Sequence, residues 1–412
     1  MDTLSNTFMR APGEAMGSFA LESAVDQLAH EIGIDPVALR MRNEPETGPL
    51  DGKAYSHRRL RENYTRGAEL FGWSRRTPEP GSMRDGRWLI GWGAASAYHP
   101  SFSLPANVTV RLAADGTVLV RCGFQEMGMG AATAQAQIAA DALGVPVEAV
   151  RVEYGDTELP TGPMAGGSVQ TASVAASLVQ ACRKLKRSVF ALAQRSGSSP
   201  LRGRKPTQVR ARDSGLYPLD GSPGESYAAI LDRAGKPAVE AAFGSDTGIG
   251  KVAGQVRFMS KFLLDQRRWL KGASGAHFCE VRVDPVTGEV RVSRWVGAFD
   301  IGTVVNPKTA TSQIRGGIVM GIGAALSEAT LVDPGSGRIV NPSLSEYHIP
   351  VNADIPKIEI SFLDDPDPTM PLGILGAGEV GITGVAAAVA NAVFHATGKR
   401  VCDLPITLDK LL

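Results

Sequence analysis

The stretch that most constrains this chain lies near its C-terminus, where four glycines surround one carboxylate. Residues 376–384, which we call the glutamate loop, read Gly-Ala-Gly-Glu-Val-Gly-Ile-Thr-Gly and run into an alanine-rich segment that predicts a helix. Glycines at this density allow positive φ and a close approach of the backbone to a ligand. The helix start would offer unpaired N–H groups and a positive dipole end. The stretch therefore predicts a ligand-binding loop.

Glu379 is the candidate catalytic residue of this loop, since it is the only charged residue between Asp367 and Lys399. A poorly solvated setting raises the pKa of a carboxyl group above its ordinary value of about 4.3, which suits a general base. A structural alternative is a helix-entry glutamate, because acidic residues are common near helix N-termini. The glycines also match a dinucleotide fingerprint, but Asp367–Pro371 stands where that motif needs an apolar strand.

Composition limits the classes of function. With 412 residues, 43% of them hydrophobic, the chain can bury a core in more than one domain or subdomain. Its net charge of +1 gives no reason to expect nucleic acid, and no apolar run approaches the roughly 18 residues of a membrane span. The six histidines have no ligand spacing, so we expect no protein-ligated zinc. Isolated cysteines are expected to be buried thiols: Cys122, Cys182, Cys279 and Cys402.

Alternating apolar residues predict two hairpins, one over 108–121 and one over 277–296. Each hairpin is followed by a glycine-containing loop and a helix that bears glutamine, Gln135 in one case and Gln313 in the other. This repeated order predicts an internal duplication, with similar halves around one ligand. We therefore expect an α+β fold of two related mixed sheet and helix subdomains with a cofactor between them. Their expected bounds are 1–240, with a basic surface loop at 195–222, and 241–412.

Two further helices are predicted by their periodicity. One has an apolar face formed by Leu21, Val25, Leu28 and Ile32. The other has an apolar face formed by Val174, Leu178, Cys182 and Leu185, and it follows a glycine-rich loop over 162–171. Ser168 is a candidate cap for this helix, whose first N–H groups could hold a phosphate. A plain glycine-rich turn is the alternative.

Five short strings, in order along the chain, resemble one family. They are Phe-Met-Arg-Ala-Pro-Gly-Glu at 8–14, Glu-Met-Gly-Met-Gly at 126–130, Gly-Gly-Ser-Val-Gln-Thr at 166–171, Asn306-Pro307 followed by Gln313, and Gly378-Glu379. Together they resemble the molybdenum-binding large subunit of the xanthine oxidase and aldehyde oxidoreductase family. The sequence of these strings is most similar to that of bacterial aldehyde oxidoreductases that use molybdopterin cytosine dinucleotide.

The resemblance implies roles for individual residues. Glu379 matches the catalytic glutamate that takes a proton from Mo–OH, and Gln313 matches a glutamine near the pterin or the apical oxo ligand. Arg10 and Met9 match a segment close to the metal, which the pterin dithiolene holds without a side-chain ligand. Met129 is often glutamine in the family, so one pterin hydrogen bond is expected to be absent or supplied by the backbone. The remaining cofactor-binding matches are Gly128, Met129, Gly166, Gly167, Ser168, Val169, Gln170, Thr171 and Gly378.

The resemblance also implies a reaction and partners. The implied reaction oxidises aldehydes to carboxylic acids with water as oxygen donor. The alternatives are hydroxylation of an N-heterocycle by the same chemistry and a truncated, cofactor-free scaffold chain. The family's N-terminal half and its iron–sulfur and flavin domains are not recognisable here. We therefore expect that half, an iron–sulfur subunit and an FAD subunit as partners, in the cytoplasm or, through a partner's export signal, in the periplasm.

Overall fold

The computed structural model describes residues 7–244 and 251–412, so that 1–6, the start of the expected first subdomain, and 245–250 lie outside the description. The chain divides into two compact units. Unit 1 comprises residues 1–101, 270–368 and 375–412. Unit 2 comprises residues 102–269 and 369–374.

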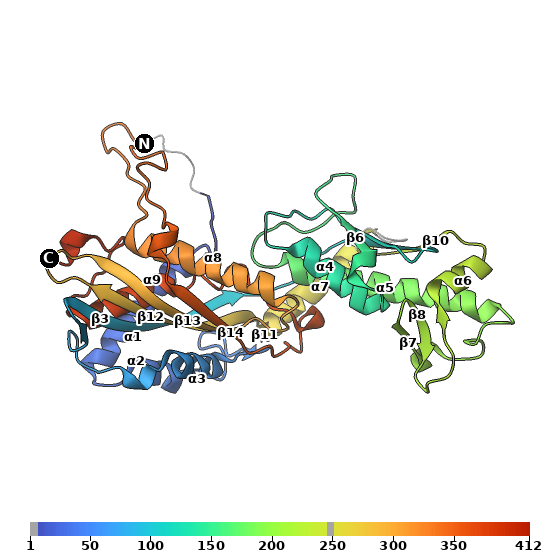
Figure 1. Cartoon of the computed structure of the whole chain (residues 1–412), viewed down its shortest axis with the longest axis horizontal. Helices are drawn as coiled ribbons and strands as arrows, with labels where there is room; N and C mark the ends of the chain where they lie inside the picture. Colours follow the sequence, from blue (N-terminus) through green and yellow to red (C-terminus); the bar gives the residue numbers. More distant parts are fainter. Residues whose placement is uncertain (1–6, 245–250) are drawn as a thin grey trace. The chain divides into compact units, whose positions relative to one another are not determined.

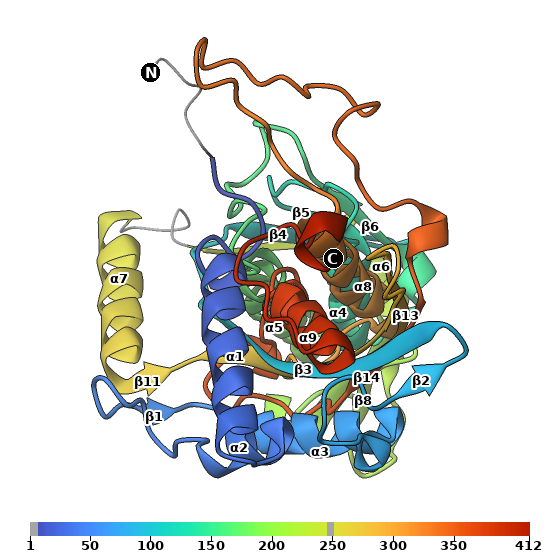
Figure 2. The same cartoon turned by 90° about the vertical axis from the view of Figure 1, so that its left-hand side faces the viewer.

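Unit 1 is built on a mixed sheet with the strand order β14-β13-β12-β3-β2. Figure 2 shows α2 and α3 on one face of this sheet and α8 and α9 on the other. The strands of this sheet are β2 (Arg84–Asp85), β3 (Trp88–Pro100), β12 (Gly272–Val283), β13 (Val290–Asp300) and β14 (Lys357–Phe362). The short strand β1 (Ala54–Tyr55) of unit 1 lies outside this sheet and pairs with β11. The helices of unit 1 are α1 (Glu14–Glu31), α2 (Pro36–Arg42), α3 (Leu60–Phe71), α8 (Pro307–Leu326) and α9 (Val385–Thr397).

Unit 2 contains a mixed sheet of order β10-β4-β5-β6 and a smaller one of order β7-β8-β9 (Figure 1). The apolar face expected for α5 is fully buried. The strands are β4 (Val108–Ala113), β5 (Val118–Arg121), β6 (Val150–Glu153), β7 (Val209–Arg212), β8 (Gly215–Pro218), β9 (Glu225–Ser226) and β10 (Ala238–Phe243). The helices are α4 (Ala131–Leu143), α5 (Gln170–Arg195), α6 (Tyr227–Arg233) and α7 (Lys251–Arg268), and β11 (Trp269–Leu270) follows at the boundary of the units.

The two units contain the same order of elements, as the duplication in the sequence predicts. In unit 2, β4 and β5 form an antiparallel hairpin, α4 follows, β6 pairs in parallel with β5, and α5 comes next. In unit 1, β12 and β13 form the hairpin, α8 follows, β14 pairs in parallel with β13, and α9 comes next. The glutamate loop and the glycine-rich loop before α5 therefore occupy the same place in the two repeats.

In each sheet, the strand that pairs with the first strand of the hairpin comes from the part of the chain next to the other repeat. β3 lies in sequence just before the first repeat but pairs with β12, for example Gly272 with Pro100. β10 lies in sequence before the second repeat but pairs with β4. This exchange makes both units discontinuous, so the expected contiguous subdomains 1–240 and 241–412 do not coincide with them. Pairing between strands so distant in sequence has no local signal.

The basic region at 195–222 is not only a loop. It contains β7 and β8, which pair from Val209 with Pro218 to Arg212 with Gly215. Asp213 and Ser214 join them with φ of 47° and 53°. A two-residue hairpin turn with positive φ at both positions matches the twist of the strands, and Asn-Gly or Asp-Gly is its usual sequence. Asp-Ser does not give that signal.

Cysteine burial follows the expectation at Cys122, Cys182 and Cys279 but not at Cys402, which is exposed. Burial raises the pKa of Cys122 and of Cys182 to about 12, so both are thiols at neutral pH. None of the helices in the described part of the chain has the length and apolarity needed to cross a membrane.

Helix α1 packs on the rest of unit 1 through its polar face. Glu22 and Asp26 are buried, whereas Leu21 is 63% exposed and Leu28 and Ile32 are 51% exposed. The periodicity in the sequence marks the apolar face correctly, but that face points away from the core of the unit. Buried carboxylates are tolerated only when they are paired and hydrogen-bonded.

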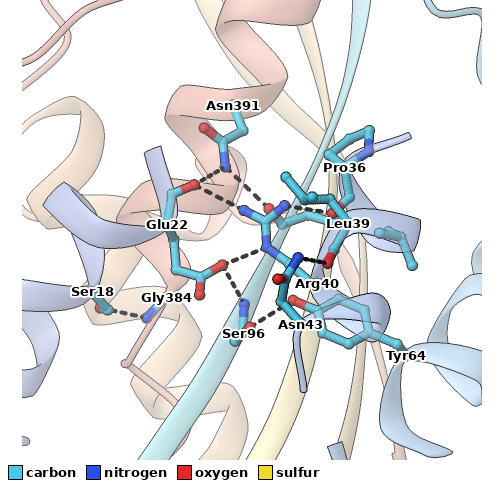
Figure 3. A network of polar contacts seen from close by, with 12 residues as sticks. Ser18, Glu22, Pro36, Leu39, Arg40, Asn43, Tyr64, Ser96, Gly384 and Asn391 are labelled. Carbon is cyan, nitrogen blue, oxygen red and sulfur yellow. Dashed lines mark hydrogen bonds and ion pairs between the residues drawn. The ribbon is translucent and has the colours of Figure 1, made fainter. Parts of the chain in front are cut away.

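A buried network satisfies Glu22 and joins four elements (Figure 3). Glu22 Oε2 lies 2.7 Å from Arg40 Nε and accepts a hydrogen bond from the backbone N–H of Ser96, so α1 contacts α2 and β3. Arg40 also donates to the carbonyls of Pro36 and Glu22. Asn391 of α9 donates to the carbonyl of Glu22. The contact with Glu22 raises the pKa of Arg40 although burial opposes its charge, so the pair is ionic.

We expect Glu22→Leu to lower the free energy of unfolding by about 3–5 kcal/mol, because it leaves the Arg40 guanidinium buried without its carboxylate. Urea unfolding measures the change. The exposed pair of Arg66 and Glu69 provides the control, and Glu69→Ala should cost at most about 1 kcal/mol. Equal effects of the two substitutions would contradict the role assigned to the network.

Candidate functional site

Two glycines of β3 allow α9 to lie directly against this strand. A Cβ at Gly91 would come within 1.8 Å of the carbonyl oxygen of Ala392, and one at Gly93 within 2.3 Å of that of Ala388. Any larger residue on this face of β3 would force the backbones apart. The alanine-rich helix and the glycine-containing strand therefore bring the start of α9, and with it the glutamate loop, close to the end of β3.

Glycines also hold the glutamate loop against α8 and β3. A Cβ at Gly381 would lie 2.9 Å from Ile314 Cα, and one at Gly317 would lie 2.7 Å from the carbonyl carbon of Gly381. Gly384 has φ of 81°, and its Cβ would lie 2.2 Å from the oxygen of Ser96. The sequence predicts close backbone approach in this loop, but the neighbours it approaches are two elements of its own unit.

Arg10 and Gln313 are in direct contact, as expected for residues of one site. Arg10 Nη2 donates to Gln313 Oε1 over 3.0 Å, and Nη1 donates to the Gln313 carbonyl over 3.4 Å. Burial lowers the pKa of Arg10 below its ordinary value, and the nearby carboxylate of Glu379 opposes that shift. Three predicted residues, from the segment before α1, from α8 and from the glutamate loop, thus lie together in unit 1.

Glu379 also faces a residue that sequence reasoning did not select. His99, at the end of β3, has Nε2 2.8 Å from Glu379 Oε2, and the two side chains are 5% and 13% exposed. The expectation of a poorly solvated carboxylate is therefore met, but its surroundings are not apolar. The available signal was a lone histidine in the otherwise apolar and uncharged stretch from Trp88 to Pro100. The raised pKa expected for Glu379 stays a prediction.

The predicted pterin-contacting loops of unit 2 lie beside each other. Gln125 Oε1 accepts a hydrogen bond from Ala165 N over 2.9 Å, which ties the loop before α4 to the loop before α5. The carboxylate of Glu126 accepts from the backbone N–H groups of Gly128, Gly130 and Ala132. Burial alone would raise the pKa of Glu126, but these N–H groups lower it, so the carboxylate is ionised and holds the loop that carries Gly128 and Met129.

Ser168 is strained, and its hydroxyl has no hydrogen-bond partner among the residues that the structure describes. Its φ is 55°, in the left-handed region that costs a non-glycine residue about 1–2 kcal/mol. Its Oγ is buried without a hydrogen bond. It does not cap α5, whose N-cap is Val169 and whose first turn has no side-chain cap. An uncapped start of a 26-residue helix beside a buried hydroxyl can hydrogen-bond an anion.

The predicted site residues fall into one group in each unit. Glu379, Gly378, Gln313 and Arg10 belong to unit 1, together with Met9, whose side chain is 68% exposed. The remaining residues, Gly128, Met129, Gly166, Gly167, Ser168, Val169, Gln170 and Thr171, belong to unit 2. The first group offers a carboxylate and a guanidinium, with the imidazole of His99 beside them, and the second offers backbone N–H groups and a hydroxyl.

Comparisons with known proteins show the family of the chain. A family model described as the molybdopterin cofactor-binding domain matches residues 66–356, and another of the same description matches residues 1–44. The chain is 39% identical over 414 residues to the aldehyde oxidoreductase molybdenum-binding subunit PaoC of Escherichia coli O157:H7, covering 100% of this chain and 53% of that subunit. It is 32% identical to the putative xanthine dehydrogenase molybdenum-binding subunit XdhA of Escherichia coli (strain K12), covering 98% and 52%.

Among solved structures, quinoline 2-oxidoreductase from Pseudomonas putida 86 superposes with a TM-score of 0.81 at 25% identity, over 98% of this chain and 52% of that chain. The α+β fold of molybdopterin-binding type expected from the sequence is thereby confirmed. The chain spans about half the length of the curated relatives it matches.

The glycine contacts around the glutamate loop lead to a stability prediction. We expect Gly381→Ala to lower the free energy of unfolding by about 1–3 kcal/mol, because its Cβ would overlap the α8 backbone at Ile314, which cannot move cheaply. Gly17→Ala in α1 is the control, since a Cβ there meets nothing within 4 Å. That substitution should be neutral or stabilise by about 0.5–1 kcal/mol. Urea unfolding of both variants checks the difference, and a neutral Gly381→Ala would contradict it.

Proposed function

Because the chain belongs to the molybdopterin cofactor-binding domain family, we propose that it is the C-terminal portion of a molybdenum hydroxylase subunit that oxidises aldehydes to carboxylic acids with water as oxygen donor. The observation that carries the proposal is the position of Glu379. Its carboxylate is largely buried, faces His99 and lies near Arg10, and it sits on a loop that glycines fix to the surrounding elements. The similarity to an aldehyde oxidoreductase subunit supports the choice of aldehydes.

The residues of unit 2 fit a phosphate-bearing pterin. The buried Ser168 hydroxyl needs a hydrogen-bond partner, and the uncapped start of α5 favours an anion. The backbone of Ser168 is strained by its positive φ, and such strain is common in residues that form a binding site. We propose that the loop over 166–171 holds the pterin and its phosphates, with Gly128 and Met129 in the neighbouring loop. The cytosine dinucleotide form of the cofactor is part of this proposal.

The residues of unit 1 supply the acid–base chemistry. When bound, the molybdenum cofactor supplies the redox centre that takes two electrons from the substrate. Glu379 accepts, at a carboxylate oxygen, the proton that the oxygen nucleophile loses. Arg10 and Gln313 are joined by two hydrogen bonds, which restrict the orientation of both side chains. Their remaining donors would hold the cofactor. Partial burial of Glu379 excludes water that would compete for its proton.

Exposed apolar surface in unit 1 supports the proposed partners. The apolar face of α1 is uncovered, and so are Phe8 and Met9 just before it. The segment between α8 and β14, residues 327–351, extends away from the sheet in Figure 2. It exposes Leu331, Val332, Ile339, Val340, Leu344, Ile349 and Val351. Apolar surface of this extent is typical of interfaces, so we propose that the other half of the subunit covers it and that iron–sulfur and FAD subunits complete the enzyme. Its cytoplasmic location stays a prediction.

Hydroxylation of an N-heterocycle is the second candidate. The similarity to quinoline 2-oxidoreductase favours it, because the same acid–base residues would serve either substrate class. Turnover of a panel of aldehydes and N-heterocycles by the assembled enzyme separates the two. A cofactor-free scaffold is the remaining alternative, and the molybdenum content of the assembled protein excludes or supports it.

Glu379→Gln tests the proposed reaction, because glutamine keeps the size and polarity of the side chain but cannot accept the proton. In the assembled enzyme, kcat for aldehyde-dependent dye reduction should fall by about 10²-fold or more, while molybdenum content and melting temperature stay unchanged. Glu62→Gln in the first turn of α3 is the control for a helix-entry glutamate, and it should leave kcat unchanged. Full activity in a molybdenum-replete Glu379→Gln enzyme would refute the assignment.

Ser168→Ala tests the proposed phosphate loop. The Ser168 hydroxyl bonds no group in the described part of the chain, so its removal should leave the melting temperature unchanged or raise it. Retained pterin in the assembled enzyme should fall, and further in the double variant with Thr171→Ala. Ser173→Ala is the matched control, because its hydroxyl bonds Val169 O and Leu104 N. It should lower the melting temperature by the loss of two hydrogen bonds, each about 1 kcal/mol. Unchanged pterin in Ser168→Ala would count against the loop.

A further inference from the structure

We propose that His99 is a positioning residue for Glu379, which holds one carboxylate oxygen so that the other is directed toward the reacting proton. The inference rests on the proposed function of Glu379 and adds a second residue to it. The motifs that marked the site in the sequence do not include His99, which the tertiary packing of β3 against α9 and the glutamate loop brings to it. Glu379 and His99 come from elements 280 residues apart in sequence and meet at 2.8 Å.

Residues on both sides of His99 hold the loop that carries Glu379, one through its backbone and one through its side chain. Tyr98 N donates to Thr383 Oγ1 over 3.1 Å, near the end of the glutamate loop. Gly376 N, at the start of the loop, donates to Ser101 Oγ over 3.2 Å. The loop is therefore fixed to β3 before and after Glu379. These two hydrogen bonds fix the position of the loop relative to β3, and the imidazole of His99 lies opposite the carboxylate of Glu379.

His99 differs from two other buried histidines of unit 1. His277 contacts Thr383 O with Nε2 and accepts from Trp295 Nε1 with Nδ1. His395 likewise contacts Thr77 O with Nε2, and its Nδ1 accepts from the backbone N–H of Trp92. Both rings use their two nitrogens to hold the core together.

His57 resembles His99 more closely, because its Nε2 lies 2.9 Å from a carboxylate oxygen of Asp300. His99 directs Nε2 at the carboxylate of Glu379 in the same way. In addition, His99 Nδ1 is buried with no hydrogen-bond partner among the residues that the structure describes.

The burial of His99 Nδ1 disfavours a proton on this nitrogen. A buried N–H without an acceptor on a charged ring costs more free energy than a buried lone pair on a neutral ring. A ring that carries its proton on Nε2 avoids that cost and would be the form that donates to Glu379. Nε2 and Glu379 Oε2 are 2.8 Å apart but are not aligned as a hydrogen bond in this structure, and such bonds at catalytic groups often align only when the ligand is bound. Arg10 is a charged group whose electrostatic field also reaches Glu379.

His99→Leu in the assembled enzyme tests the proposal, because leucine fills a similar volume without a donor. We expect kcat to fall by about 10-fold or more, the usual effect of losing a group that orients a reacting one, with KM and molybdenum content little changed. The acidic limb of the pH profile should move to higher pH, because the carboxylate loses a donor that favours its charged form. His99→Gln, which restores an N–H donor, should recover part of kcat and of the profile.

Crystal structures of the assembled wild-type and His99→Leu proteins give a readout independent of turnover. The Glu379 carboxylate should occupy one conformer in the wild type and in His99→Gln, and more than one in His99→Leu. His395→Gln is the matched control, a buried histidine whose loss should lower the melting temperature without moving the pH profile or the Glu379 conformer.

The outcomes separate this inference from the proposed function. If Glu379→Gln keeps full activity, the proposed function fails whatever His99 does. If Glu379→Gln is inactive while His99→Leu keeps wild-type kcat, pH profile and a single Glu379 conformer, then only the role of His99 is overturned. An effect of His395→Gln equal to that of His99→Leu would also overturn it, because general loss of packing would then explain both.

Discussion

The buried ion pair of Glu22 and Arg40 sets the relative positions of the segments that carry the candidate site of unit 1. Glu22 bonds the backbone of β3 at Ser96, three residues before His99, and its carbonyl accepts from α9 at Asn391. Ser18, one turn earlier, accepts from Gly384 N at the end of the glutamate loop. Such a pair adds little net stability over a packed apolar one, but an incomplete network is costly, so only one arrangement of these segments satisfies it.

Glycines, which have no side chain, determine how closely these segments approach one another. Gly91 and Gly93 admit α9 to β3, and Gly317 and Gly381 admit the glutamate loop to α8. The repeat in unit 2 has its glycine-rich loop in the same place, between the third strand and the last helix. One repeat carries the carboxylate of Glu379 at this position, and the other carries the buried hydroxyl of Ser168 before a helix without a side-chain cap. The duplicated topology thus places the two groups to which we assign different roles in equivalent loops of the two repeats.

Much of the local structure could be predicted from the sequence. The hairpins at 108–121 and 277–296 and the helices that follow them appear where turn residues and periodicity indicate. The motifs also selected Arg10 and Gln313, which are in contact. The errors share one cause. The β7–β8 hairpin lacks the usual turn residues, the units exchange their outer strands, and the apolar face of α1 points outward, so the information needed in each case is not local.

The sequence by itself determined the two repeated hairpins and their helices, the family and a carboxylate in a glycine-rich loop, because each motif behind these depends on residues close together in the chain. Tertiary structure alone decided which elements share a unit, which face of α1 is buried and that His99 stands beside Glu379. These features depend on strand pairing and on the pairing of buried charges between distant segments. Periodicity reports only that a helix has two unlike faces, and the partner that satisfies the buried charges decides which of them turns inward.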